Sequence, residues 1–328
     1  MFTPDTFQIA LLMMVTTTVC WGSWANTYKL TKGYRFELFY WDYAIGIVLI
    51  ALVLGLTLGS RGGPDSLVNN MRNADTSNIV LALVGGFIFN IANLLLVAGI
   101  DLAGLAVAFP VAIGIALVEG VVLSYALQPK GDPMLLGLGV ALAIVAIIAD
   151  GKAYGSLSAG RTAVSRKSIV VCIVSGLLMG IFAPFVTRAL TAGRPLTSYS
   201  VAVFFTLGAL LCCFVVNVYF MRKPLVGEPV DFRDYFRQRP VDHMLGLLGG
   251  AIWGTGAVFN FVAAGFVGVA ISYAIGQAAP MVAALWGVFV WKEFRGANNA
   301  AKKYLAAMFV CYLLAIIIIA RAYNTSEV

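Results

Sequence analysis

The sequence predicts an all-α integral membrane protein that crosses the bilayer ten times. Three observations predict this fold class: 61% of the 328 residues are hydrophobic, only 11% are charged, and the hydrophobic residues form ten long runs between short polar segments. A soluble domain averages about 25% charged residues. This composition therefore excludes an ordinary water-soluble globule.

Most of the ten runs are close to the roughly 20 residues that a helix needs to cross ~30 Å of hydrocarbon. The short polar segments between them leave no room for a large soluble domain. The expected spans are residues 7–28, 36–58, 78–100, 104–127, 134–149, 169–187, 196–221, 244–266, 269–291 and 304–320.

The distribution of basic residues predicts the orientation. The loops after the odd-numbered spans hold 16 of the 22 Lys and Arg residues, and the opposite side holds 6. The positive-inside rule then places the odd loops in the cytoplasm and both termini outside an inner membrane. The net charge of +7 is accounted for by these loops and predicts no nucleic-acid partner. No basic residue precedes the first run, so we expect no cleaved signal peptide.

The chain divides into two halves that resemble each other weakly. The polar stretch 150–168 separates five spans from five, which predicts a first repeat over 1–154 and a second over 155–328. An odd number of spans per half inverts the second copy in the membrane, and inverted repeats place a substrate near the midplane. At a shift of 164 residues, Leu81, Gly85, Gly86 and Ile88 fall on Leu245, Gly249, Gly250 and Ile252.

Prolines lie inside three of the predicted spans, at Pro110, Pro184 and Pro280. A membrane proline frees a backbone carbonyl and bends the helix, which is tolerated where neighbouring helices or a cavity satisfy the freed group. Simple kinks and cavity-lining breaks both fit this pattern.

Several segments are similar to the ureide permease family of the drug/metabolite transporter superfamily. The strongest are residues 249–256 (Gly-Gly-Ala-Ile-Trp-Gly-Thr-Gly) and 277–282 (Gln-Ala-Ala-Pro-Met-Val), followed by Trp286-Gly287 and Glu293-Phe294-Arg295. Weaker pieces in the first half are Trp41-Asp42-Tyr43, Gly85-Gly86 and Asn93-Leu94.

The resemblance implies two inverted five-helix halves and uptake driven by protons. Plant members carry allantoin, uracil and related polar heterocycles, and relatives that carry sugars share the Gly-rich, Pro-containing ninth span. Plant members also have a large central loop with a nucleotide-binding-like motif. Here residues 150–168 are short and lack the Gly-x-x-x-x-Gly-Lys-[Ser/Thr] phosphate cradle, so we expect no nucleotide and no other cofactor.

Aromatic and amide side chains in four spans are the predicted substrate contacts. Aromatic rings can stack on a sugar or a planar base, and amides can hydrogen-bond a polar solute. Packing, an interfacial aromatic belt and helix-to-helix hydrogen bonds are the alternatives. The candidates are Trp21, Trp24, Asn90, Asn93, Trp253, Asn260, Tyr273 and Gln277.

Asp42 and Glu119 are the only acidic or basic residues well inside the predicted spans. A carboxyl in a membrane helix is expensive to retain and usually faces a polar cavity or a partner. Burial favours the neutral, protonated form of Glu119, so it is the first candidate for the coupling proton. Asp42 is the second, because pairing with Lys29 or Lys32 would keep it charged.

At the end of the ninth span, Glu293 is the predicted gate, beside the basic residues Lys292 and Arg295. The single histidine, His243, reads as a solvated loop residue. The five cysteines fall inside the spans, and their spacing is typical of neither disulfides nor metal ligands. We expect them to be small side chains packed in the core.

These features predict a proton-coupled importer of a ureide, nucleobase or related nitrogen heterocycle. A sugar or nucleoside uptake carrier is the alternative within the superfamily, and drug or metabolite efflux fits the buried amides less well. An intramembrane enzyme would need converging nucleophile, base or metal ligands, and two separate carboxyls do not supply them. The expected partners are the solute, protons and lipid, with a homodimer left open.

Overall fold

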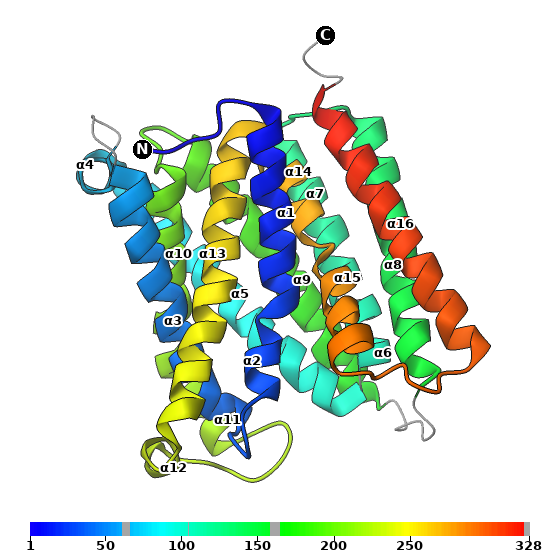
Figure 1. Cartoon of the computed structure of the whole chain (residues 1–328). Helices are drawn as coiled ribbons and strands as arrows, with labels where there is room; N and C mark the ends of the chain where they lie inside the picture. The colour runs from blue at the N-terminus through cyan, green and yellow to red at the C-terminus, as the bar shows by residue number, and fades with distance from the viewer. Residues whose placement is uncertain (61–65, 104, 158–164, 325–328) are drawn as a thin grey trace.

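The computed structural model describes the whole chain except residues 61–65, 104, 158–164 and 325–328 (Figure 1). Within that part, ten helices are long and apolar enough to cross a membrane, which confirms the ten predicted spans and the all-α class. The start of the predicted fourth span, residue 104, lies outside the described residues.

The first half contains spans one to five. α1 (Phe7–Ser23) and α2 (Ala25–Lys29) form the first span, and α3 (Phe36–Thr57), extended by the 3₁₀ turn Leu58–Ser60, forms the second. A short α4 (Leu67–Asn73) leads into α5 (Thr76–Ala103). The fourth span comprises α6 (Leu105–Ala108), a π-helical turn (Phe109–Ile113) and α7 (Gly114–Leu127), and the fifth is α8 (Pro133–Gly155).

The second half contains spans six to ten. The sixth span is α9 (Arg166–Thr191), and the seventh is α10 (Ser198–Cys212), continued by a π-helical turn (Cys213–Asn217) and α11 (Val218–Arg222). The eighth span is α13 (Pro240–Val267), and the tenth is α16 (Asn299–Asn324). The ninth span consists of α14 (Val269–Gly276), α15 (Ala279–Leu285) and a π-helical turn (Trp286–Val290). Before α13, the short α12 (Phe232–Phe236) lies in the connecting segment.

The fifth span, α8, is longer than the sequence predicts. It begins after Asp132, whose side chain accepts a hydrogen bond from the backbone of Leu135 (2.8 Å), with Pro133 at the first helical position. Both are standard helix-start features. The helix then continues to Gly155 rather than ending at residue 149. This extension brings Asp150 into the span.

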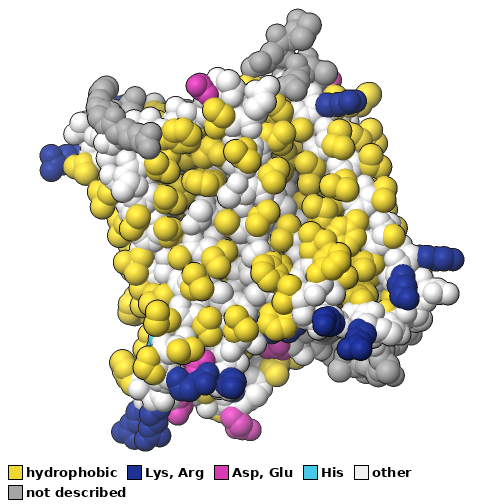
Figure 2. Space-filling model, in the orientation of Figure 1, with side chains coloured by type: hydrophobic (Ala, Val, Ile, Leu, Met, Phe, Trp, Pro, Cys, Tyr) yellow, Lys and Arg dark blue, Asp and Glu magenta, His cyan; other side chains and the backbone are white. Residues whose placement is uncertain are grey.

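The helices run along a common direction, and the first begins at the same end of the bundle where the last finishes (Figure 1). α2, α11 and α12 lie at the opposite end. Figure 2 shows hydrophobic side chains covering the middle of this face, with Lys and Arg gathered mainly toward the α12 end.

We predict that the α12 end faces the cytoplasm, because of the 16-to-6 distribution of basic residues. A reporter fused after Val328 should then read as external, and one inserted after Lys223, between α11 and α12, as cytoplasmic. The predicted central loop around Ser158 lies outside the described residues. The reverse pattern of reporter activity would overturn the predicted orientation.

Helix packing follows a paired pattern. α5 packs on α9 and α13 packs on α1, which are spans three on six and eight on one. α3 packs on α13 and α5 on α10, which are spans two on eight and three on seven. If each span is replaced by the span five places away in the chain, the contact of three on six becomes eight on one, and the contact of two on eight becomes seven on three. An inverted repeat requires this exchange, although the repeat itself stays a prediction.

Glycines lie where the paired helices cross most closely. A Cβ atom built on Gly86 of α5 would overlap the carbonyl oxygen of Phe205, and one on Gly208 of α10 would overlap that of Leu83. At the crossing of α3 and α13, Gly250 stands against the Tyr43 carbonyl in the same way. Small residues let helix backbones approach this closely in a bilayer.

Gly86→Ala is expected to lower the free energy of unfolding by at least about 2 kcal/mol, because the new methyl must displace backbone. The matched control is Gly137→Ala on α8, where a Cβ meets no atom within 4 Å. The control should keep or gain stability, since alanine is the better helix former by up to ~1 kcal/mol. Equal melting temperatures for the two variants in detergent would contradict the close crossing.

Candidate functional site

A cavity of about 390 Å³ lies within the bundle and is lined by residues of spans one to nine. It extends from Tyr273 and Phe261 in the interior to Lys29 and Glu293 at the end of the bundle where α2 finishes. Its volume falls in the range of roughly 300–1,000 Å³ typical of small-molecule pockets.

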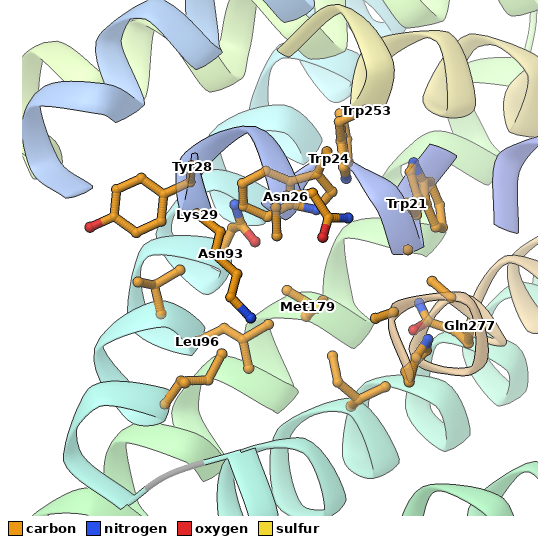
Figure 3. Close-up of a pocket in the computed structure, with 18 of the residues that line it drawn as sticks. Trp21, Trp24, Asn26, Tyr28, Lys29, Asn93, Leu96, Met179, Trp253 and Gln277 are labelled. Atoms are coloured by element: carbon orange, nitrogen blue, oxygen red, sulfur yellow. The ribbon is translucent and has the colours of Figure 1, made fainter. Parts of the chain in front are cut away.

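Stacked aromatic rings form one wall of the cavity. Trp21 of α1 stacks on Trp253 of α13 with ring centroids 5.7 Å apart, and Trp253 stacks on Phe89 of α5 at 4.8 Å. Trp24 also lines the cavity and packs against Tyr43 at 4.6 Å. Figure 3 shows Trp24 and Trp253 above the cavity and Met179 and Leu96 below it. A flat ring is the solute shape that fits such a wall best.

Two amides lie among the aromatic side chains of this wall. The amides of Asn93 and Gln277 line the cavity (Figure 3). The indole Nε1 of Trp21 is buried and has no hydrogen-bond partner among the described residues. An unpaired buried donor costs about 1–3 kcal/mol. Trp21 Nε1 lies against Gly256 of α13 rather than in the cavity, whereas the two amides offer a solute both donors and acceptors.

Gln277 is held where the ninth span is interrupted. α14 ends at Gly276 and α15 begins at Ala279, so Gln277 lies in the irregular segment between them. Pro280, in the first turn of α15, has no backbone N–H to continue the preceding helix. Interrupted helices of this kind form the midplane binding sites of many secondary transporters.

Tyr273 contributes its ring rather than its hydroxyl to the cavity. The hydroxyl lies 3.2 Å from the carbonyl oxygen of Met179 and 3.4 Å from that of Ala116, so its proton is shared between neighbouring helices. The side chain is 2% exposed.

Asn90 and Asn260 are not among the residues that line the cavity. Asn90 Oδ1 accepts from the Tyr40 hydroxyl at 2.6 Å, and Asn93 Nδ2 donates to the same hydroxyl at 2.9 Å. Asn260 Nδ2 donates to the carbonyl of Ser272 at 2.9 Å, and Ser272 Oγ donates back to the Asn260 carbonyl at 2.8 Å. These bonds fit the helix-bridging alternative for both asparagines.

Polar contacts join the first span to the ninth span and to the turn that follows it, near the mouth of the cavity. Glu293 forms an ion pair with Lys29 of α2. Trp291 Nε1 donates to Asn26 Oδ1 at 2.6 Å, and Trp286 Nε1 donates to Ser23 Oγ at 2.9 Å. The predicted gate residue Glu293 therefore joins two helices that belong to different halves, and its partner is Lys29 rather than a neighbour in sequence.

Glu119 is likewise not among the cavity-lining residues. Its side chain lies against Gly180 of α9, where a Cβ would meet the Glu119 carboxylate. The oxygen Oε2 is buried without a hydrogen-bond partner in the described part of the chain.

Asp42 is buried at the α12 end of the bundle, outside the cavity wall, and accepts three hydrogen bonds. The donors are the Tyr34 hydroxyl at 2.7 Å, the Tyr235 hydroxyl of α12 at 2.6 Å, and His243 Nδ1 at 2.9 Å. The expected pairing with Lys29 or Lys32 is therefore wrong.

The prediction that His243 is a solvated loop residue is also wrong. His243 is inside α13, and its ring lies 4.6 Å from that of Tyr235 and 5.6 Å from that of Tyr34. Asp42 and Tyr34 lie 201 and 209 positions from His243 in the chain, so no local pattern in the sequence could indicate these contacts.

Sequence reasoning missed two acidic residues of the cavity, Asp101 and Asp150. Asp101 is exposed at the end of α5, near the mouth. Asp150 is 2% exposed. The prediction that Asp42 and Glu119 are the only charged residues well inside the spans is therefore wrong. The available signal was length, since residues 134–149 form a run too short to cross the hydrocarbon.

The chain is similar to known membrane permeases in sequence and to a solved structure in fold. Residues 160–322 match the ureide permease family model. Ureide permease 1 of Arabidopsis thaliana is 22% identical over 375 residues, which cover 94% of this chain and 96% of that protein. Ureide permease 5 of the same plant is 23% identical, covering 94% and 92%. A solved structure described only as "Crystal structure of protein" superposes with a TM-score of 0.64 at 19% identity, covering 95% of this chain and 98% of that one.

The described residues form ten helices that could cross a membrane, and spans one to nine line an internal cavity. Together with permease relatives along nearly the whole chain, this indicates a multi-pass membrane transporter rather than an enzyme. These matches support a ureide permease-like family for the chain.

Proposed function

We propose that the protein is a proton-coupled secondary transporter that imports a ureide, a nucleobase or a related nitrogen heterocycle across the inner membrane. The similarity to proteins named ureide permeases supports this solute class. Proton coupling comes from the family resemblance in the sequence and is part of the proposal.

The observation that carries the proposal is the composition of the cavity. Stacked indoles beside two amides suit a small planar solute that both donates and accepts hydrogen bonds. Asn93 and Gln277 are the proposed polar contacts, with Trp21, Trp24, Trp253 and the ring of Tyr273 around them. The Lys29–Glu293 pair is the proposed gate at the mouth.

The stacked wall also fits one face of a pyranose or the base of a nucleoside. A sugar or nucleoside carrier is therefore the second candidate function. The solute panel below separates the two.

Thermal unfolding of the purified protein tests the proposal. A ligand at 100 times its Kd stabilises a folded protein by about 2.7 kcal/mol, which raises its melting temperature measurably. We expect allantoin or uracil to raise it and glucose to leave it unchanged. A rise with monosaccharides or nucleosides alone would favour the second candidate, and no rise with any of them would overturn uptake of these solutes.

A further inference from the structure

Asp150 is the most deeply buried charged side chain in the wall of the cavity. It projects from α8, lines the cavity and is 2% exposed. Its oxygen Oδ1 has no hydrogen-bond partner among the described residues. An ionised carboxylate in such surroundings costs several kcal/mol unless a proton or a cation compensates it.

The surroundings of Asp150 are tyrosines rather than basic residues. Tyr154 follows one turn later on α8, and Tyr312 faces it from α16, each close enough to interact electrostatically with the carboxyl. The buried Tyr312 hydroxyl also lacks a partner within the described part of the chain. The two nearby lysines are engaged elsewhere: Lys29 pairs with Glu293, and Lys152 lies over the ring of Tyr304 at 5.4 Å.

We infer that Asp150 is the carboxyl that binds and releases the coupling proton, an inference that rests on the proposed transport function. The anion accepts a proton from water on one side of the membrane, and the neutral acid returns it to water on the other. Because the carboxyl lines the solute cavity itself, the proton and the solute bind in the same cavity, and the charge of Asp150 affects the surroundings of the solute.

A polar route joins this carboxyl to the mouth. The Tyr154 hydroxyl donates to Glu293 Oε2 at 3.4 Å, and Glu293 pairs with Lys29 at the partly exposed end of the cavity. Tyr154, one helical turn after Asp150 on α8, therefore connects this part of the wall with Glu293 at the mouth. Opening of the Lys29–Glu293 pair would give the carboxyl access to water at that end.

The two carboxyls predicted from the sequence are less well placed. Asp42 is held by three donors and is not part of the cavity wall. Glu119 is also outside the wall and lies against α9 at Gly180. Asp150 alone of the three lines the space where solute would bind.

Asp150→Asn tests the inference, because the amide keeps the shape of the carboxyl but cannot exchange a proton. In proteoliposomes with an inward proton gradient, wild-type protein should accumulate labelled allantoin or uracil, whichever stabilises it. Asp150→Asn should abolish accumulation yet retain exchange of labelled for unlabelled solute. Glu119→Gln should accumulate as wild type does, and Asp150→Glu should recover part of the accumulation.

Undiminished accumulation by Asp150→Asn, or its loss in Glu119→Gln instead, overturns the assignment. So does accumulation that persists without a proton gradient and needs a sodium gradient. Infrared difference spectra between mildly acidic and mildly alkaline pH supply a readout that needs no solute. They should show one titrating carboxyl fewer in Asp150→Asn than in wild type, and identical spectra overturn the inference. If no probe binds wild type, the proposed function fails, while the spectra still decide separately whether Asp150 binds and releases a proton.

Discussion

Gln277→Leu is expected to abolish detectable binding of the transported heterocycle while leaving the fold intact. The amide lines the cavity from the irregular segment of the ninth span, where α14 has ended and α15 has not begun. Leucine is close in size but can neither donate nor accept a hydrogen bond. Each lost bond to a buried solute group costs about 1–3 kcal/mol, and two such bonds correspond to roughly 100-fold or more in Kd.

Asn260→Leu is the matched control, since it also removes one buried amide from the second half. Its amide bonds the backbone of Ser272, and Asn260 does not line the cavity. This variant should lower the melting temperature, because a buried carbonyl loses its donor. Isothermal titration and thermal unfolding of both variants separate the effects. If Gln277→Leu binds as wild type, or fails to fold while Asn260→Leu folds, the assigned roles of the two amides are wrong.

Asn93→Leu is expected to combine the two effects. Its amide lines the cavity and also donates to the Tyr40 hydroxyl, which in turn bonds Asn90. Both binding and stability should therefore fall in this variant.

The ten spans could be predicted from the sequence because a bilayer imposes a simple length and composition rule. The ends of the spans could not be predicted, because a charged residue near the end of a helix resembles the start of a polar loop. At Asp150 this rule fails, since α8 runs on to Gly155 and the carboxyl turns inward to the cavity.

The candidate site was predicted in part. Trp21 and Trp24 are three residues apart on the first span, and both line the cavity. Asn90 and Asn93 have the same spacing, yet only Asn93 lines it. Three residues turn an α-helix by about 300°, so such a pair diverges by roughly 60°. At the edge of a cavity that difference decides which side chain faces the solute, and it depends on neighbours that the sequence alone does not position.

Asp42→Ala is expected to lower the free energy of unfolding by about 3–5 kcal/mol, which is the usual effect of removing one member of a buried polar network. The variant leaves the Tyr34 hydroxyl and His243 Nδ1 without their shared acceptor. It also releases Tyr235, which ties α12 to α3. Tyr235→Phe should cost only about 1 kcal/mol, because it deletes a single hydrogen bond. Asp231→Ala, which removes the N-cap of α12 on the exposed surface, should cost a similar amount.

The same network predicts how stability depends on alkaline pH. Burial, and secondly the hydrogen bond to Asp42, raises the pKa of Tyr34 and of Tyr235, above the value of about 10 in an unfolded chain. The folded protein therefore holds these two protons more tightly than the unfolded chain does. Their contribution is complete below about pH 10 and is lost as the pH rises through the folded-state pKa. Melting temperatures measured across this range should fall less steeply in Tyr34→Phe/Tyr235→Phe than in wild type. Equal slopes would show that the folded protein does not hold these two protons more tightly than the unfolded chain does.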